Sequence, residues 1–571
     1  MSDLSRVPDQ LRRYVVEQDY AQYNEVDQAV WRFVLLQTHQ RLQHTAHSAY
    51  RDGLAQTGIS VERIPRISEM SECLSRFGWS AVCVDGFIPP RAFQEFQAAS
   101  ILPIAADIRS IDHLTYTPAP DIIHEAAGHA PILPDARYAA YLRAVGEVGK
   151  KAFSSPEDAR VYAAIFELSE AKETRGASPA LLQRAEQRLE HALSQITVAS
   201  EASRISRLYW WTAEYGLIGT PHDYRLYGAG LLSSLWESHA CHDPAVRKLP
   251  LSAECVEQPY DITRTQPQLF VARDFDQLFS VLSDVEASLA HRRGGDDSLL
   301  AALQSQDLAT LSFRGQRFVS GTLRAVSGSA ASGLLTFQGR VGLGAQGRLE
   351  QVFDAGIQGY HLPFGPLADG AALGELPAVG KRVRLRFASG AMLEGELAST
   401  AHDDRGRLLS ARLLNYRLES ERAGICDQGA EYLLFVAADL HTAQAGALDP
   451  AFHPAPAPGP APGSVPKPRT LATRERALLS LYERAIEAFK KQAGSTALPV
   501  FRAIHAELGA RFPDEWLLRW NLLECWCKWG ESAESASFGR ELETELLALE
   551  RKFAYREPIA SGLRYLSSLA A

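Results

Sequence analysis

Residues 121–131 have the sequence DIIHEAAGHAP, in which two histidines five positions apart flank a glutamate. Imidazole is a good ligand for divalent iron, zinc or copper, so the pair suggests a metal site. On an ideal helix the second histidine would lie about 140° round the axis from the first. His124 and His129 can therefore share one metal only if the helix ends or distorts between them. Gly128 and Pro131 supply such an interruption.

The best candidate for a third ligand is Glu214, in the aromatic stretch YWWTAEYGL at residues 209–217. A carboxylate is costly to bury alone, so this one should pair with a cation. Two histidines and one carboxylate on one side of a metal are typical of non-haem Fe(II) oxygenases. A zinc hydrolase that uses the His-Glu-His cluster of residues 124–129 is the alternative. It is disfavoured because its usual spacing places the histidines four apart, on one helix face.

Four ordered stretches resemble the pterin-dependent aromatic amino acid hydroxylases: YTPAPDIIHE at 116–125, GHAP at 128–131, WTAEYGL at 211–217 and YGAGLLSS at 227–234. The resemblance extends from about residue 11 to about residue 278, roughly half of the chain. It implies a mostly α-helical catalytic domain in which His124, His129 and Glu214 hold Fe(2+). It also implies a tetrahydropterin cofactor, similar to tetrahydrobiopterin, with O2 as co-substrate.

The same resemblance implies roles for residues that would otherwise be unremarkable. Phe93 would stack on the pterin and Glu125 would face it, whereas a core aromatic and a solvated carboxylate are the plain alternatives. Arg109 would bind the carboxylate of the amino acid substrate, because guanidinium grips carboxylate through two hydrogen bonds. Thr117 would support the same end of the substrate.

Trp210 and Ser233 complete the implied site. Trp210 lies one turn before Glu214 and would pack on the substrate ring, with ordinary core packing as the alternative. Family members that hydroxylate phenylalanine or tyrosine generally carry tryptophan here, and tryptophan-hydroxylating members carry phenylalanine. Ser233 would hydrogen-bond a ligand histidine and so fix its tautomer. We expect phenylalanine to be converted to tyrosine. Tyrosine or tryptophan hydroxylation, and a scaffold protein with a vestigial site, remain alternatives.

Length and composition define the class of protein. A chain of 571 residues, 46% of them hydrophobic, is long enough for about two to four domains with real cores. The net charge of −9 gives no reason to expect nucleic acid or an anionic membrane as a partner. The N-terminus lacks an apolar signal region, and no stretch approaches eighteen apolar residues. Seven scattered cysteines suit a reducing compartment, so a cytoplasmic location is expected.

Pattern changes along the chain predict a multi-domain protein. The catalytic domain should occupy residues 1–293, with a helix over 24–56 and a short strand at 80–84. After a short helix, glycine-rich, alternating stretches from about residue 311 to about residue 440 predict a small antiparallel β domain of unknown role over 294–450, with a hairpin at 383–397 and a barrel as one possible form. Residues 451–470 should form a Pro/Ala-rich linker.

Residues 471–571 predict an α-helical domain. Four tryptophans at near-helical spacing, Trp516, Trp520, Trp526 and Trp529, are expected to be core residues rather than a ligand cage. Helical regions of this kind often mediate association, so a homo-oligomer formed through this domain is one expectation.

Overall fold

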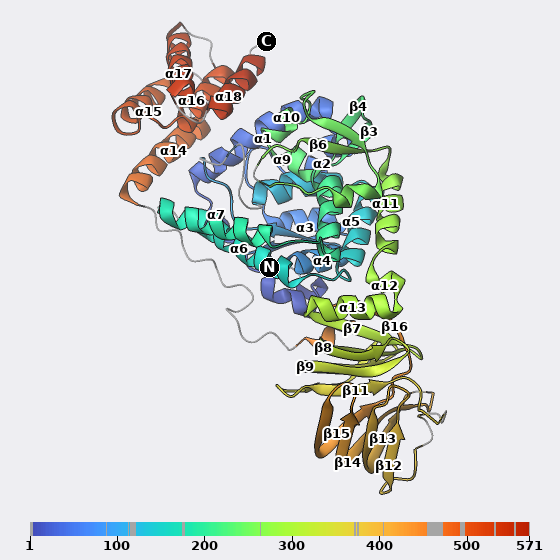
Figure 1. Ribbon diagram of the computed structural model, residues 1–571. Helices are drawn as coiled ribbons and strands as arrows, with labels where there is room; N and C mark the ends of the chain where they lie inside the picture. Colours follow the sequence, from blue (N-terminus) through green and yellow to red (C-terminus); the bar gives the residue numbers. More distant parts are fainter. Residues whose placement is uncertain are drawn as a thin grey trace.

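The computed structural model describes residues 4–569 except 87, 112–113, 115–120, 174–177, 263, 370–372, 374–375, 404, 454–471, 492–496, 530–532 and 553–555. Three parts follow one another in space: a β-rich part, a central helix-rich part and a helical bundle (Figure 1). Thr117 and most of the expected linker lie outside the described residues.

The helix-rich part comprises the described residues up to Arg293. Its α-helices are α1 (Glu25–Thr45), α2 (Ser48–Gln56), α3 (Ile67–Ser75), α4 (Pro90–Ala98), α5 (Ala136–Gly149), α6 (Pro156–Glu173), α7 (Pro179–Ser194), α8 (Glu201–Tyr209), α9 (Ala229–Ser233), α10 (Glu237–Ala240), α11 (Phe275–Ala287) and α12 (Ala290–Arg293). Its 3-10 turns are η1 (Leu4–Arg6), η2 (Asp9–Tyr14), η3 (Tyr20–Gln22), η6 (Ala130–Ile132) and η8 (Ala253–Glu257). Two π-helical turns, η5 (Ile123–His129) and η7 (Trp210–Glu214), complete it.

Two small sheets accompany these helices. Strands β1 (Ser80–Val84) and β2 (Ile101–Ala105) pair in parallel, and the expected strand at 80–84 is present. The second sheet has the order β4-β3-β6-β5. Its strands are β3 (Leu217–Thr220), β4 (Asp223–Leu226), β5 (Arg247–Pro250) and β6 (Gln268–Ala272). Strand β3 begins three residues after Glu214, so this sheet anchors the carboxylate's turn.

The expected helix over residues 24–56 is wrong in one respect, because the chain forms two helices there. Asn24 begins α1 with a capping box, in which its side chain accepts from the Asp27 amide and the Asp27 carboxylate accepts from the Asn24 amide. Ala46 then adopts an extended conformation. The His47 ring accepts a hydrogen bond from the Ala49 amide and so begins α2.

The β-rich part starts with α13 (Gly295–Ser305) and continues as strands up to η9 (Pro450–Phe452). The strands are β7 (Leu308–Phe313), β8 (Arg317–Ser329), β9 (Ser332–Ala345), β10 (Arg348–Asp354), β11 (Tyr360–Phe364), β12 (Arg382–Arg386), β13 (Met392–His402), β14 (Leu408–Ser420), β15 (Ile425–Phe435) and β16 (Leu440–Ala445). One sheet has the order β10-β9-β8-β7-β16, with β11 also on β9, and the other has the order β12-β13-β14-β15. All these pairings are antiparallel. The expected hairpin is β12–β13, and both strand orders are open among the described residues rather than barrel-like.

The bundle is built from α14 (Thr473–Lys491), α15 (Leu498–Arg511), α16 (Leu517–Trp529), α17 (Ala533–Lys552) and α18 (Arg556–Leu569). Trp516 and Trp520 are almost completely buried, as a core role predicts. Trp526 is half-buried, and the side chain of Trp529 lies outside the described residues. The bundle's apolar face packs on α1 of the same chain, so this face is used within the molecule.

The buried apolar side chains form two main cores. One runs without interruption through the helix-rich part and into the bundle. The other fills the β-rich part and takes in Phe153 from the helix-rich part. Among the described residues, no helix is both long and apolar enough to cross a membrane.

Candidate metal centre and active site

His124 and His129 lie at the two ends of a π-helical turn, η5 (Ile123–His129). In a π-helix the backbone hydrogen bonds join residues five apart, so residues i and i+5 lie on the same side. Their ring centroids are 5.1 Å apart. The distortion that the five-residue spacing requires is therefore a π-turn. It passes into the 3-10 turn η6, where Pro131 has no amide hydrogen to continue the pattern.

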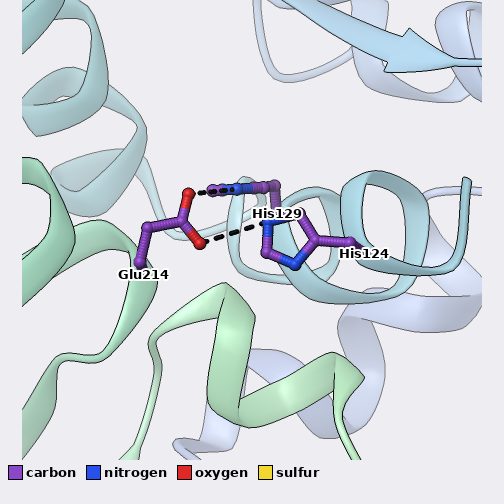
Figure 2. A group of neighbouring side chains, drawn as sticks. All are labelled: His124, His129 and Glu214. Atoms are coloured by element: carbon purple, nitrogen blue, oxygen red, sulfur yellow. Dashed lines mark hydrogen bonds and ion pairs between the residues drawn. The ribbon is translucent and has the colours of Figure 1, made fainter. Parts of the chain in front are cut away.

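Glu214 ends a second π-turn, η7, which continues α8. Its Oε1 lies 3.0 Å from Nε2 of His129 and its Oε2 lies 3.2 Å from Nε2 of His124 (Figure 2). One ligating atom from each residue lies within 4.8 Å of the other two. Two imidazole nitrogens and one carboxylate at such distances fit a single Fe(II).

Helix α9 packs closely against both π-turns because two glycines leave room for it. A Cβ on Gly128 would stand 2.6 Å from the carbonyl oxygen of Ala229. A Cβ on Gly228 would overlap the carbonyl oxygen of Glu214. The backbones therefore approach closely at Gly228, and this brings Ser233 to the site.

Ser233 contacts His124 and selects its tautomer. The Ser233 hydroxyl donates its one hydrogen to the carbonyl oxygen of Ala229 at 2.7 Å. Its oxygen, 3.2 Å from Nδ1 of His124, therefore accepts from that nitrogen. In the neutral ring this leaves the Nε2 lone pair directed at the Glu214 side, as a metal ligand requires.

Arg109 is buried in an ion pair with Asp121. Oδ2 of Asp121 accepts from Nε of Arg109 at 2.8 Å, and Oδ1 accepts from Nη2 at 2.7 Å. Oδ1 also accepts from the His124 amide at 3.0 Å. Burial by itself would raise the pKa of Asp121, but the Arg109 guanidinium holds it below its ordinary value. Arg109 therefore supports the turn that carries His124, and only part of its guanidinium can reach a substrate.

Burial and neighbouring charge act in opposite directions on the pKa values of His124 and Glu214. Burial lowers the pKa of a histidine, but the Glu214 carboxylate outweighs this and raises the pKa of His124 to about 9. Burial raises the pKa of a carboxyl group, but the two histidines hold the pKa of Glu214 well below its ordinary value. The site is thus arranged around a carboxylate that stays ionised next to positive charge.

Glu125 occupies the same π-turn, with its Oε2 3.9 Å from Nε2 of His129. It is buried, and its Oε2 has no hydrogen-bond partner among the described residues. Burial raises its pKa above the ordinary value. A buried acceptor without a hydrogen-bond partner among the described residues is a natural contact for a bound polar ligand.

Two aromatic groups flank the ligating residues. The ring of Phe93 meets Tyr209 edge-on at 5.5 Å, and Tyr209 lies tilted over His129 at 6.2 Å. Trp210 stacks on Tyr215 at 4.6 Å and on Tyr260 at 4.2 Å. Two rings that are this close and nearly parallel to the Trp210 indole cannot lie side by side on one of its faces. Tyr215 and Tyr260 therefore cover opposite faces of the indole. Trp210 can therefore offer a substrate its edge.

A second group of potential ligands lies in the bundle: His505, Glu541 and Glu545. Nε of the buried Arg519 donates to Oε2 of Glu545 at 2.8 Å, the same oxygen that faces Nε2 of His505 at 2.9 Å. The guanidinium already occupies the position of a cation, so this group is an ion-pair network that joins three helices.

The family model for biopterin-dependent aromatic amino acid hydroxylases matches residues 13–199 and 192–292 of the chain. Half of the chain thus carries the fold and motifs of one enzyme family. This part of the chain belongs to the biopterin-dependent aromatic amino acid hydroxylases. It is a monooxygenase domain, and the family's reaction uses iron, a tetrahydropterin and O2.

Individual relatives resemble this hydroxylase domain at moderate identity. The phenylalanine-4-hydroxylase of Pseudomonas aeruginosa is 28% identical over 274 residues, 48% of this chain and 87% of the relative. That of Ralstonia nicotianae is 29% identical over 269 residues, 47% of this chain and 72% of the relative. A crystal structure of the Chromobacterium violaceum phenylalanine hydroxylase with iron(III) and 7,8-dihydrobiopterin is 26% identical, with a TM-score of 0.38, and covers 49% of this chain and 86% of that chain.

Sequence reasoning did not identify Asp121, Tyr209 or Tyr260 as parts of the hydroxylase site. Asp121 left a recognisable signal, since an aspartate three residues before His124 has the spacing of a helix cap. Tyr209 and Tyr260 left none, because an aromatic residue beside apolar neighbours is usually ordinary core. Burial and the charge of Glu214 raise the pKa of the Tyr260 phenol to about 12. Its contact with the site comes entirely from the packing of distant segments.

Proposed function

We propose that the chain hydroxylates the ring of L-phenylalanine to give L-tyrosine, with O2 and a tetrahydropterin at a single Fe(II). The observation that carries the proposal is the convergence of His124, His129 and Glu214 from two π-turns within 4.8 Å. When bound, the iron and the pterin together supply the activation of O2. The protein residues contribute binding, orientation and exclusion of water.

The residues around the metal have different tasks in this proposal. His124 binds through Nε2, because Ser233 accepts the hydrogen on its Nδ1. Glu214 supplies negative charge that lowers the net charge of the bound cation. Glu125 and Phe93 form the pterin side, where the buried carboxyl group accepts or donates a hydrogen bond and the ring supplies an apolar contact.

The amino acid substrate is proposed to bind on the side of Arg109 and Trp210. Among the described residues, Asp121 engages Nε and Nη2 of Arg109, and Nη1 is proposed to meet the substrate carboxylate. Thr117, outside the described residues, is assigned to the same end by resemblance. The edge of Trp210, backed by Tyr215 and Tyr260, borders the ring of the substrate.

The test is product analysis with the purified full-length chain, Fe(II), a tetrahydropterin and O2. Phenylalanine, tyrosine and tryptophan are supplied separately, because a tyrosine 3-monooxygenase of Drosophila melanogaster is also similar, at 27% identity. We expect tyrosine from phenylalanine. His129→Ala should abolish turnover, since the metal loses one of three protein ligands.

Three other outcomes would change or replace this proposal. A product only from tyrosine or tryptophan would change the substrate but keep the chemistry. Bound zinc, with hydrolytic activity and no hydroxylation, would favour a zinc hydrolase. No product at all from an iron-loaded, folded protein would favour the scaffold alternative, in which the residues after 293 carry the function.

A further inference from the structure

The end of β16 is fixed by hydrogen bonds within the β-rich part and also contacts the hydroxylase domain. Gly446 donates its amide to the carbonyl of Leu308 at 2.7 Å, and its own carbonyl accepts from the Thr310 hydroxyl at 2.5 Å. Its φ of +80° is a conformation that favours glycine. Directly before it, Ala445 donates its amide to the carbonyl of Lys151 at 3.0 Å.

Arg91, the second residue of α4, fills the space beside Gly446. A Cβ on Gly446 would overlap Nη2 of Arg91. The same Nη2 donates to the carbonyl of Lys150 at 3.3 Å, and Nε donates to Oε1 of Glu95 at 3.2 Å. Arg91 and the β-rich part therefore hold two adjacent carbonyls, those of Lys150 and Lys151, at the C-terminal end of α5.

Helix α4 links this junction to the candidate site. Gly146 of α5 lets α4 approach closely, since a Cβ there would stand 2.5 Å from the amide nitrogen of Ala98. Two residues after Arg91, Phe93 meets the ring of Tyr209 at 5.5 Å. Tyr209 in turn lies over His129. A shift of the first turn of α4 would thus move Phe93 relative to the ligating residues.

We propose that Arg91 is a positioning residue through which the β-rich part sets the pterin side of the site. Gly446 confines the Arg91 guanidinium to the carbonyl of Lys150, which fixes the first turn of α4 and the placement of Phe93. The proposal rests on the proposed function, which assigns Phe93 to the pterin. It gives the β-rich part a role in cofactor binding, without any contact of its own with the cofactor.

The experiment measures binding of 7,8-dihydrobiopterin to the iron-loaded full-length chain by calorimetry, together with the KM for tetrahydropterin. Arg91→Ala and Gly446→Ala should each weaken binding by about 5- to 10-fold, with kcat changed much less, as expected for coupling between separate sites. Arg91→Lys should restore part of the affinity. The double variant should bind no more weakly than Arg91→Ala alone, because the two residues act through one contact.

Gly390→Ala is the matched control. Gly390 lies in the same part with a φ of +87°, but a Cβ there would meet nothing within 4 Å. It reproduces the backbone strain without displacing Arg91, and pterin binding should stay unchanged. Arg91→Ala keeps the proposal testable if Gly446→Ala does not fold.

Three results would overturn the proposal: unchanged pterin affinity in folded Arg91→Ala, strictly additive losses in the double variant, or an equal loss in Gly390→Ala. Failure of the proposed function looks different. In that case the wild-type chain itself would not bind dihydrobiopterin, and the role of Arg91 would be refuted with it. If the wild type binds and the variants bind equally well, only the positioning role fails.

Discussion

The bundle and the β-rich part are attached to the hydroxylase domain in different ways. The bundle shares its core with that domain: Phe33 of α1 meets Trp516 at 5.1 Å and Trp520 at 4.8 Å, edge to face. The β-rich part has a core of its own, which Phe153 and Ala290 enter from the hydroxylase domain. Its other contacts with that domain include hydrogen bonds from the Ala445 amide to the carbonyl of Lys151 and from the Thr442 hydroxyl to the carbonyl of His291.

The difference shows that the distance of a part from the catalytic domain along the sequence does not predict whether its folding depends on that domain. The bundle is the more distant part along the chain, yet α1 is buried between it and α9. The nearer β-rich part forms a separate unit that meets the domain along a narrow junction. We therefore expect the bundle to unfold with the hydroxylase domain, and the β-rich part to unfold independently.

The largest effect should come from ending the chain at residue 453, which removes the bundle. The face of α1 that carries Phe33 would be exposed, and large exposed apolar patches cause aggregation. We expect most of the protein to become insoluble, as measured by the soluble fraction after expression. As a control, a protease site introduced between residues 456 and 468 should allow cleavage while the bundle stays bound. A soluble, fully active truncated chain would refute the shared core.

Phe33→Ala should destabilise the hydroxylase domain and the bundle together by about 3 to 5 kcal/mol, the usual cost of emptying a buried phenylalanine site. All nine tryptophans lie outside residues 294–450, so urea unfolding followed by tryptophan fluorescence reports on those two parts alone. Phe364→Ala, in the core of the β-rich part, is the control. It should leave the fluorescence transition in place, and a shift as large as that of Phe33→Ala would contradict separate unfolding.

Arg32→Ala should have a smaller effect at the same junction. Nη2 of Arg32 lies 2.9 and 3.0 Å from the two carboxylate oxygens of Glu524, whose side chain is only 1% exposed. Truncating one partner of a buried pair leaves the other charge unpaired. Because Lys528 stays 3.0 Å from Glu524, we expect a loss of about 2 to 3 kcal/mol in the fluorescence transition. No loss would mean that apolar packing alone holds the bundle.

The smallest effect is expected away from both junctions. Arg188 and Glu167 pair at 2.6 Å between α7 and α6, with side chains 63% and 39% exposed. Exposed pairs of this kind contribute little because water and salt screen them. Arg188→Ala should change stability by less than about 0.5 kcal/mol. A larger change in the urea transition would show that charge alone, without burial, can account for the effect of Arg32→Ala.

Much of the site could be predicted from local pattern. The spacing of His124 and His129, with Gly128 between them, demands a distorted helix, and a π-turn is present. The Ser233 contact followed from a motif of the family. The double stacking of Trp210 could not be predicted in this way, because Tyr260 comes from a separate segment. Nor could the pairing of Arg109 with Asp121, since an arginine alone does not reveal its partner.

The sequence by itself determined the chemistry: two imidazoles and a carboxylate in motifs whose glycines and proline dictate the local backbone. It also determined that strands dominate residues 294–450 and that the last hundred residues form helices. Only the tertiary structure decided how these parts depend on one another. Arg32 and Glu524 are 492 positions apart, and Gly446 meets Arg91 from another part of the chain. No periodicity encodes such contacts, because they arise when buried surfaces formed separately meet.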